Sequence, residues 1–140
     1  PEAGATQAAR LVTTYPWSTM LAVALGASIG AVLRWAAGVW VNHLWQGFAL
    51  GTLLVNCVGG LLIGAALVGF ERWPTELPRA FFITGFLGGL TTFSAFSGES
   101  LQLLQRGQLS LAALHTTAHV LGSLTCAVAG FSLARLVLRG

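Results

Sequence analysis

Polar side chains recur at helical spacing inside apolar stretches of this sequence. Thr52 and Asn56 lie four residues apart, and Gly60 continues the same helix face. An Asn in such a stretch is costly unless its amide finds partners, because a buried polar group loses its hydration. The amide of Asn56 can donate two hydrogen bonds, so this residue either joins two helices or binds an anion.

Two aromatic rings and a carboxylate follow at a spacing of three. Phe93, Phe96 and Glu99 share one face of the expected helix, and Ser94 and Ser97 lie beside them. An aromatic ring has a positive edge, so ring edges turned into a narrow pore can hold a small anion. A fixed positive charge would bind the ion too tightly to release it. The competing interpretation places both rings against lipid or neighbouring helices.

A third polar face carries His115, His119, Ser123 and Cys126, at spacings of four, four and three. Two histidines four residues apart can bind a metal ion, but we expect neither a carboxylate nor a third ligand near them. The pattern instead favours a hydrated polar stripe that faces the same pathway as the residues above.

One segment combines glycine pairs with consecutive threonines in the middle of an apolar stretch. Residues 85–94 read GFLGGLTTFS. Glycine is a poor helix former and threonine competes for backbone hydrogen bonds, so we expect a helix break at Gly88 to Thr92. Such a break persists in a membrane only where protein or water satisfies the freed groups. Freed carbonyl oxygens form a natural site for a monovalent cation.

The first apolar stretch contains a single charge, Arg34, at helical spacing from Gly26, Gly30 and Gly38. Glycines four residues apart let helix backbones approach closely. An Arg this far inside a membrane span must face protein or water and pair with carbonyls or a carboxylate. We therefore expect Arg34 to be a structural anchor near the mouth of the pathway.

The polar residues above lie within apolar segments that are long enough to cross a membrane. The chain has 140 residues, of which 55% are hydrophobic and 8% charged, against roughly 25% charged in an ordinary soluble domain. Four apolar runs, at 20–41, 49–70, 80–104 and 111–134, each match the roughly 20 residues that cross a bilayer as a helix. The sequence predicts an all-α membrane protein with four transmembrane helices, the third broken at mid-bilayer. Residues 1–16 are expected to form a loose tail and 17–140 a single domain.

The positive charge of the chain comes from seven Arg, which lie mostly at the ends of the apolar runs. A nucleic-acid binder would cluster such charges on one face, so we expect no nucleic-acid partner. Five Arg lie on the side that holds both ends of the chain and one lies on the other side. This asymmetry favours both termini in the cytoplasm.

Together, these residues resemble the Fluc (CrcB-type) family of fluoride channels. The resemblance covers nearly all of residues 20–138. It comprises Gly-x-x-x-Gly followed by Arg in the first run, GTLLVN at 51–56 in the second, and GFLGGLTTFS at 85–94 in the third. The last string is highly specific for the family.

The resemblance implies a passive, fluoride-selective channel that exports cytoplasmic fluoride and so protects the cell from its toxicity. The family forms antiparallel, dual-topology dimers with two pores and a central structural sodium ion (Na+). The resemblance further implies a multi-pass protein of the bacterial cytoplasmic (inner) membrane. Its expected partners are fluoride, the lipid bilayer and a second copy of the chain.

The resemblance also assigns roles to particular residues. The sodium ion would be held by the backbone carbonyls of Gly88 and Thr91. An aromatic box would be formed by Phe93 and Phe96, with Asn56 as its amide partner. The polar track would comprise Thr52, Ser94 and Glu99.

Some features depart from the family pattern. Ala95 stands where the family usually has Thr, which removes one hydroxyl from the track, and His115 stands where relatives carry Tyr. The asymmetry of five Arg to one fits dual topology poorly. It leaves open that the chain pairs with an oppositely oriented paralogue, although the resemblance favours a homodimer.

Two other functions compete with a channel. A proton-coupled exporter, similar to the small multidrug transporters, would have to work through Glu99, the sole carboxylate inside a span. A membrane subunit that only scaffolds partners would not need a broken polar helix.

Overall fold

The computed structural model describes residues 16–138, and every regular element in that range is a helix. Four helical segments are long and apolar enough to cross a membrane, namely Trp17–Leu44, Leu50–Arg72, Glu76–Gln105 and Leu109–Leu138. The predicted number and order of spans are therefore confirmed. The segments extend beyond their predicted runs at every end except the start of the second, which begins one residue later than predicted, because the helices continue into the residues that flank the apolar core. The expected tail lies almost wholly outside the described residues.

The first two spans are simple helices joined by a short connection. Helix α2 covers Trp17–Val41 and is followed by one short 3₁₀ turn, η1, at Asn42–Leu44. Helix α3 covers Leu50–Arg72. Asn42 secures the start of α3, since its Oδ1 accepts a hydrogen bond from the Gly51 N–H at 2.7 Å.

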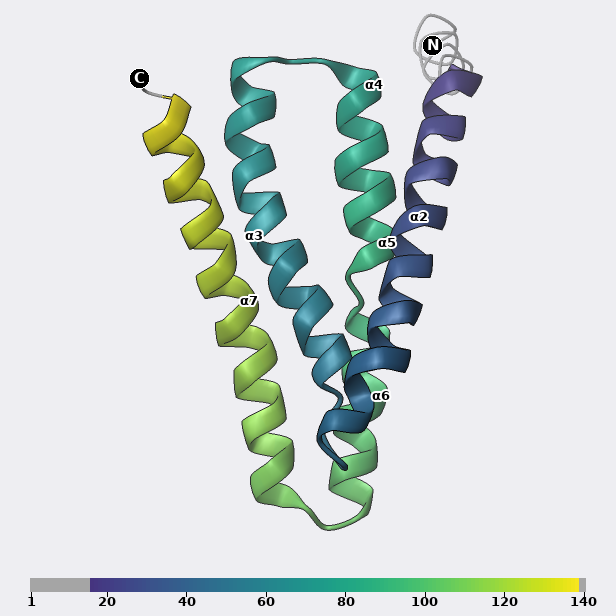
Figure 1. Cartoon of the computed structure of the whole chain (residues 1–140), viewed down its shortest axis with the longest axis vertical. Helices are drawn as coiled ribbons and strands as arrows, with labels where there is room; N and C mark the ends of the chain where they lie inside the picture. The colour runs from purple at the N-terminus through teal and green to yellow at the C-terminus, as the bar shows by residue number, and fades with distance from the viewer. Residues whose placement is uncertain (1–15, 139–140) are drawn as a thin grey trace, which may run out of the picture.

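The third span is built from several pieces, and the fourth is continuous. The third consists of α4 (Glu76–Arg79), the π-helical segment η2 (Ala80–Leu87), α5 (Gly88–Leu90) and α6 (Phe93–Gln105). Helix α7 covers Leu109–Leu138. Figure 1 shows the chain leaving helical geometry between α5 and α6, about half-way along the molecule.

Two extended residues separate α5 from α6. Thr91 has φ −83° and ψ 157°, and Thr92 has φ −153° and ψ 121°. The Thr92 hydroxyl then caps α6 by accepting a hydrogen bond from the Ala95 N–H at 3.1 Å, as Thr does at helix starts. Gly88 and Gly89, by contrast, retain helical geometry.

The helices pack in two close pairs, in which α3 lies along α7 and α2 lies against η2 and α5. Glycines make both approaches possible. A side chain at Gly30 would collide with the backbone carbonyl of Phe86, and one at Gly64 with that of Ala127. Such contacts suit helices in lipid, where van der Waals packing rather than the hydrophobic effect drives association.

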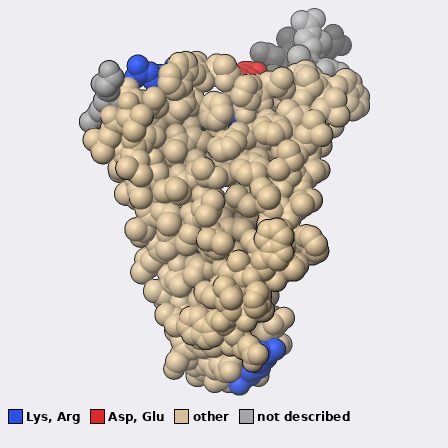
Figure 2. All heavy atoms as spheres, viewed as in Figure 1, with Lys and Arg blue, Asp and Glu red and all other residues tan. Residues whose placement is uncertain are grey.

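Charged groups gather at the two ends of the molecule. On the face shown in Figure 2, the basic and acidic atoms lie at the upper and lower rims, and the wide band between them is uncharged. The start of α2 and the end of α7 lie at the same end (Figure 1). This distribution is that of a multi-pass membrane protein.

Candidate functional site

Glu99 is the centre of one polar cluster. Its Oε1 accepts a hydrogen bond from the Thr52 hydroxyl at 2.6 Å, and its Oε2 lies 3.2 Å from Nε2 of His115. The other ring nitrogen of His115 lies 3.0 Å from the Ser100 hydroxyl. His115 is fully buried. The cluster ties α3, α6 and α7 together at the second turn of α6.

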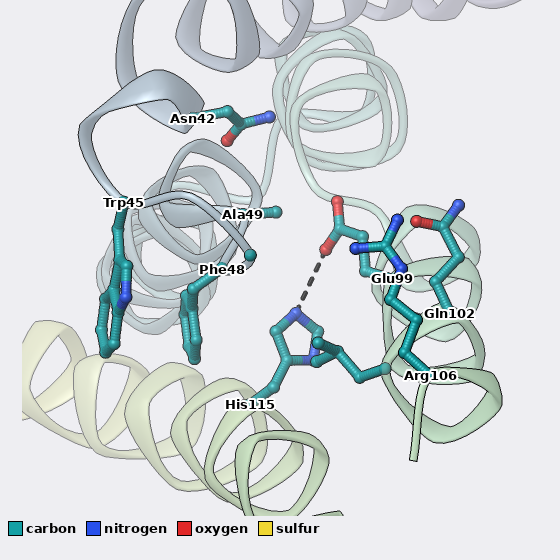
Figure 3. A pocket seen from close by; sticks show the side chains of 10 residues that line it. Asn42, Trp45, Phe48, Ala49, Glu99, Gln102, Arg106 and His115 are labelled. Atoms are coloured by element: carbon teal, nitrogen blue, oxygen red, sulfur yellow. Dashed lines mark hydrogen bonds and ion pairs between the residues drawn. The ribbon is translucent and has the colours of Figure 1, made fainter. Parts of the chain in front are cut away.

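A cavity of about 240 Å³ opens onto this cluster. In Figure 3, Glu99 and His115 both line it and contact each other directly. Trp45 and Phe48, whose rings stack at 4.9 Å, line one side, and Arg106 lines the other. The cavity therefore connects the end of the molecule that carries Arg106 to the half-buried carboxylate of Glu99.

Asn56 forms a second polar cluster at the helix interruption. Its Oδ1 accepts the Thr92 N–H at 2.8 Å, and its Nδ2 donates to the Thr92 carbonyl at 3.1 Å. The same Nδ2 lies 3.2 Å from Nδ1 of His119. The side-chain amide thus accepts the Thr92 N–H, which the extended geometry leaves without a helical partner, and adds a second donor to the Thr92 carbonyl at the start of α6.

Aromatic rings connect the two clusters. Phe96 stacks on His115, with centroids 5.5 Å apart and an angle of 9°, and contacts His119 at 4.9 Å. The two histidine rings lie 4.4 Å apart. Phe93 lies 5.5 Å from Phe96 but is 79% exposed. The structure therefore brings Phe96, both histidines, Glu99 and Asn56 into one continuous path.

An open groove of about 610 Å³ runs beside this path. It is lined largely by apolar groups from α3, η2, α5, α6 and α7. Its lining includes six of the site residues expected from the sequence, which are Asn56, Gly88, Thr91, Phe93, Phe96 and Ser123.

The remaining predicted residues lie at the edges of the path. Arg34 donates a hydrogen bond from Nε to the Gly89 carbonyl at 3.0 Å, which fastens α2 to α5. Ser94 lies 3.2 Å from the Thr92 hydroxyl, at an exposed position. Neither residue touches the Glu99 cluster.

One expectation from the sequence is wrong. We expected no carboxylate near the two histidines, but Glu99, His115 and His119 each place one ligand atom within 4.8 Å of the others. The reason is that α6 and α7 are joined by a tight turn and run back along each other. Residues 16 positions apart, such as Glu99 and His115, therefore meet.

Several residues of the two polar clusters and their surroundings were not among the predicted site residues. His119 belonged only to the expected polar stripe, and its spacing from His115 was the signal that could have placed it in the site. Thr92 takes part through its backbone, which only its position in the break indicated. Ser100 and Phe48 carried no signal, because their roles depend on packing between helices.

The family comparison adds to this geometry. Residues 21–131 match the model of the CrcB-like protein family, described as Camphor Resistance (CrcB). The chain belongs to the CrcB family. That match includes both polar clusters, the helix interruption and the glycines of the close helix contacts.

Relatives of this CrcB chain are similar over most of their length. A fluoride-specific ion channel FluC of Pseudomonas aeruginosa is 50% identical over 116 residues, covering 81% of this chain and 91% of the relative. One from Aromatoleum aromaticum is 48% identical over 114 residues, or 80% and 87% of the two chains. One from Tolumonas auensis is 47% identical over 123 residues, or 86% and 97%. These relatives are named as channels rather than as enzymes.

Proposed function

We propose that this chain forms a passive, fluoride-selective channel. The observation that carries the proposal is the continuous polar path from Thr52 through Glu99, His115 and Phe96 to Asn56, inside helices that are otherwise apolar. Polar groups inside membrane spans are costly and mark ion or substrate pathways. The fluoride channels related to this chain supply the identity of the ion.

The chemistry of the path suits a small anion that must also leave. It offers hydroxyl groups, imidazole rings and aromatic ring edges, and none of its members carries a fixed positive charge. Weak, distributed donors allow entry without trapping the ion. The rings of Phe93 and Phe96 form the aromatic box, with Thr52, Ser94, Glu99, His115 and Ser123 along the polar track.

The conducting unit that we propose is an antiparallel dimer with two pores. In the single chain, Phe93 is 79% exposed and the groove beside it is open along its length. A second copy laid across the groove would enclose Phe93 and turn each groove into a pore. An oppositely oriented paralogue would do the same, and the oligomer composition after co-expression distinguishes the two.

A structural sodium ion at the dimer centre fits the backbone at the interruption. In a continuous helix, the Thr92 N–H would donate to the Gly88 carbonyl, but here it donates to Asn56 at 2.8 Å. This frees the Gly88 oxygen, and the extended geometry turns the Thr91 carbonyl out of the helical ladder. Both residues line the groove, so their oxygens are available to a cation shared between two copies.

Export then requires no energy source other than the membrane potential. Fluoride inside a bacterial cell experiences a negative interior, worth about 2.3 kcal/mol per charge at 100 mV. A pore in the cytoplasmic membrane that excludes chloride would release fluoride without dissipating that potential. The interruption between α5 and α6 lies near the middle of the bilayer in this arrangement.

Ion efflux from liposomes tests the proposal. Purified protein is reconstituted, and fluoride and chloride efflux are measured with ion-selective electrodes at a fixed potassium potential and without a pH gradient. We expect rapid fluoride efflux, negligible chloride efflux and no efflux from protein-free liposomes. Fluoride movement that occurs only when a proton gradient is added at the same voltage would instead favour a proton-coupled exporter working through Glu99.

A further inference from the structure

His119 contains a buried nitrogen that nothing in the fold accounts for. The residue is 4% exposed. Its Nδ1 faces Asn56, but its Nε2 has no hydrogen-bond partner among the residues that the structure describes. A buried polar atom of this kind calls for a ligand or another functional reason. His119 lines the open groove together with Phe93 and Phe96, so the nitrogen belongs to the proposed ion path.

The protonation of that nitrogen follows from Asn56. The backbone of Thr92 fixes the orientation of the Asn56 amide, because its N–H must meet Oδ1 and its carbonyl must meet Nδ2. A flipped amide would set oxygen against oxygen and N–H against N–H. One hydrogen of Nδ2 is therefore used by the Thr92 carbonyl, and the second points at Nδ1 of His119. Nδ1 must accept, so the proton of the neutral ring lies on Nε2.

A hydrogen on Nε2 argues against a metal ion. Glu99, His115 and His119 are close enough for one, but a metal needs a lone pair on the ligating nitrogen and usually a hydrogen-bond acceptor at the other. If Nε2 of His119 bound a metal, Nδ1 would carry the proton and would face the Asn56 donor. The hydrogen-bond environment of His119 therefore suits an acceptor in the path and not a cation.

We propose that the Nε2–H of His119 donates a hydrogen bond to fluoride in this channel, and that Asn56 acts by positioning that donor. Both hydrogens of the Asn56 amide are engaged within the protein, so Asn56 has none left for the ion. The donor lies beside Phe96, at a ring-centroid distance of 4.9 Å, where it can share the anion with ring edges. This inference rests on the proposed function.

Three variants test the donor by fluoride efflux. His119→Phe keeps a ring but removes the donor, His119→Gln places an amide donor near the position of Nε2, and His43→Phe is the matched control at an exposed histidine outside the path. We expect His119→Phe to lower efflux on the order of tenfold to a hundredfold, as losing a hydrogen bond to a charged group does. His119→Gln should retain more efflux than His119→Phe, and His43→Phe should match the wild type. Size-exclusion profiles check that each variant assembles.

The wild-type protein provides an independent test of the tautomer. In nitrogen NMR spectra of ¹⁵N-histidine-labelled protein, His119 should show an unprotonated Nδ1 and a protonated Nε2, and fluoride should shift the Nε2–H signal. In Asn56→Asp the preference should reverse, because a carboxylate accepts a proton from Nδ1. A wild-type Nδ1–H tautomer, or zinc block that depends on His119, would overturn the inference.

The outcomes separate this inference from the proposed function. If the wild type conducts no fluoride, the channel proposal fails. If the wild type conducts fluoride and His119→Phe conducts equally well, the channel proposal stands and the donor role of His119 is refuted.

Discussion

Replacing Asn56 by Asp tests the polar path with almost no change in shape. The carboxylate can still accept the Thr92 N–H, and it can accept from His119 once the ring proton moves to Nδ1, but the hydrogen bond that Nδ2 donates to the Thr92 carbonyl at 3.1 Å is lost. That bond contributes about 1 kcal/mol, and a partly buried carboxylate set against the Thr92 carbonyl oxygen costs about 1–3 kcal/mol more. A negative charge would also stand beside an anion path. We expect fluoride efflux to fall below detection and the unfolding free energy to drop by about 2–4 kcal/mol.

The assay for this variant combines liposome efflux with chemical unfolding of the purified protein in detergent. The control is Asn42→Asp, where only the oxygen is used, to accept the Gly51 N–H at 2.7 Å. A carboxylate keeps that bond and lies favourably at the start of α3, so the control should be as stable as the wild type. Wild-type efflux and stability in Asn56→Asp would show that the donated hydrogen bonds do not matter, and the reasoning would be wrong.

Three further predictions concern other parts of the path and the fold. Phe96→Ile removes the ring that contacts both histidines and should abolish efflux while the dimer still assembles; normal efflux would exclude ring edges from the path. Glu99→Gln keeps an acceptor for Thr52 and should change the fluoride rate, not eliminate it, so a complete block would favour proton coupling. Gly64→Val forces a side chain against the Ala127 carbonyl and should lower the unfolding midpoint in detergent, at a cost of about 1–3 kcal/mol; an unchanged midpoint would contradict the close packing of α3 on α7.

The sequence was sufficient to predict the transmembrane helices and the helix faces that carry polar groups. An apolar run of about 20 residues or more crosses a bilayer as a helix, because its backbone groups must be hydrogen-bonded within the segment. Spacings of three and four residues then assign residues such as Phe96 and Glu99 to one helix face. Helical periodicity does not say which other helix that face meets. The contact between Glu99 and His115 depends on how α6 and α7 pack after their turn, and it was missed for that reason.

The hydrogen-bond partners of Asn56 could not be predicted from the sequence for the same reason. A mid-span Asn predicts a demand for hydrogen bonds, and the GGLTT segment predicts backbone groups in need of them. Only the coordinates show that each satisfies the other, at 2.8 and 3.1 Å. The sequence left open whether Asn56 joins two helices or binds an anion. Its amide hydrogens are engaged within the protein, which is why we propose His119 as the donor to the ion.

The pairing of Asn56 with Thr92 also bears on how the chain enters a membrane. Helix α3 is made before the interrupted segment, and only residues 73–75 separate it from α4. An interrupted helix that entered lipid alone would expose the Thr92 N–H to hydrocarbon. Because α3, which carries Asn56, is synthesised just before it, the two segments can enter as a hairpin with that N–H already paired to Asn56. Biogenesis of this protein therefore depends on the order of α3 and α6 along the chain, and a permuted chain that delivers α6 first should be retained by the insertion machinery or degraded.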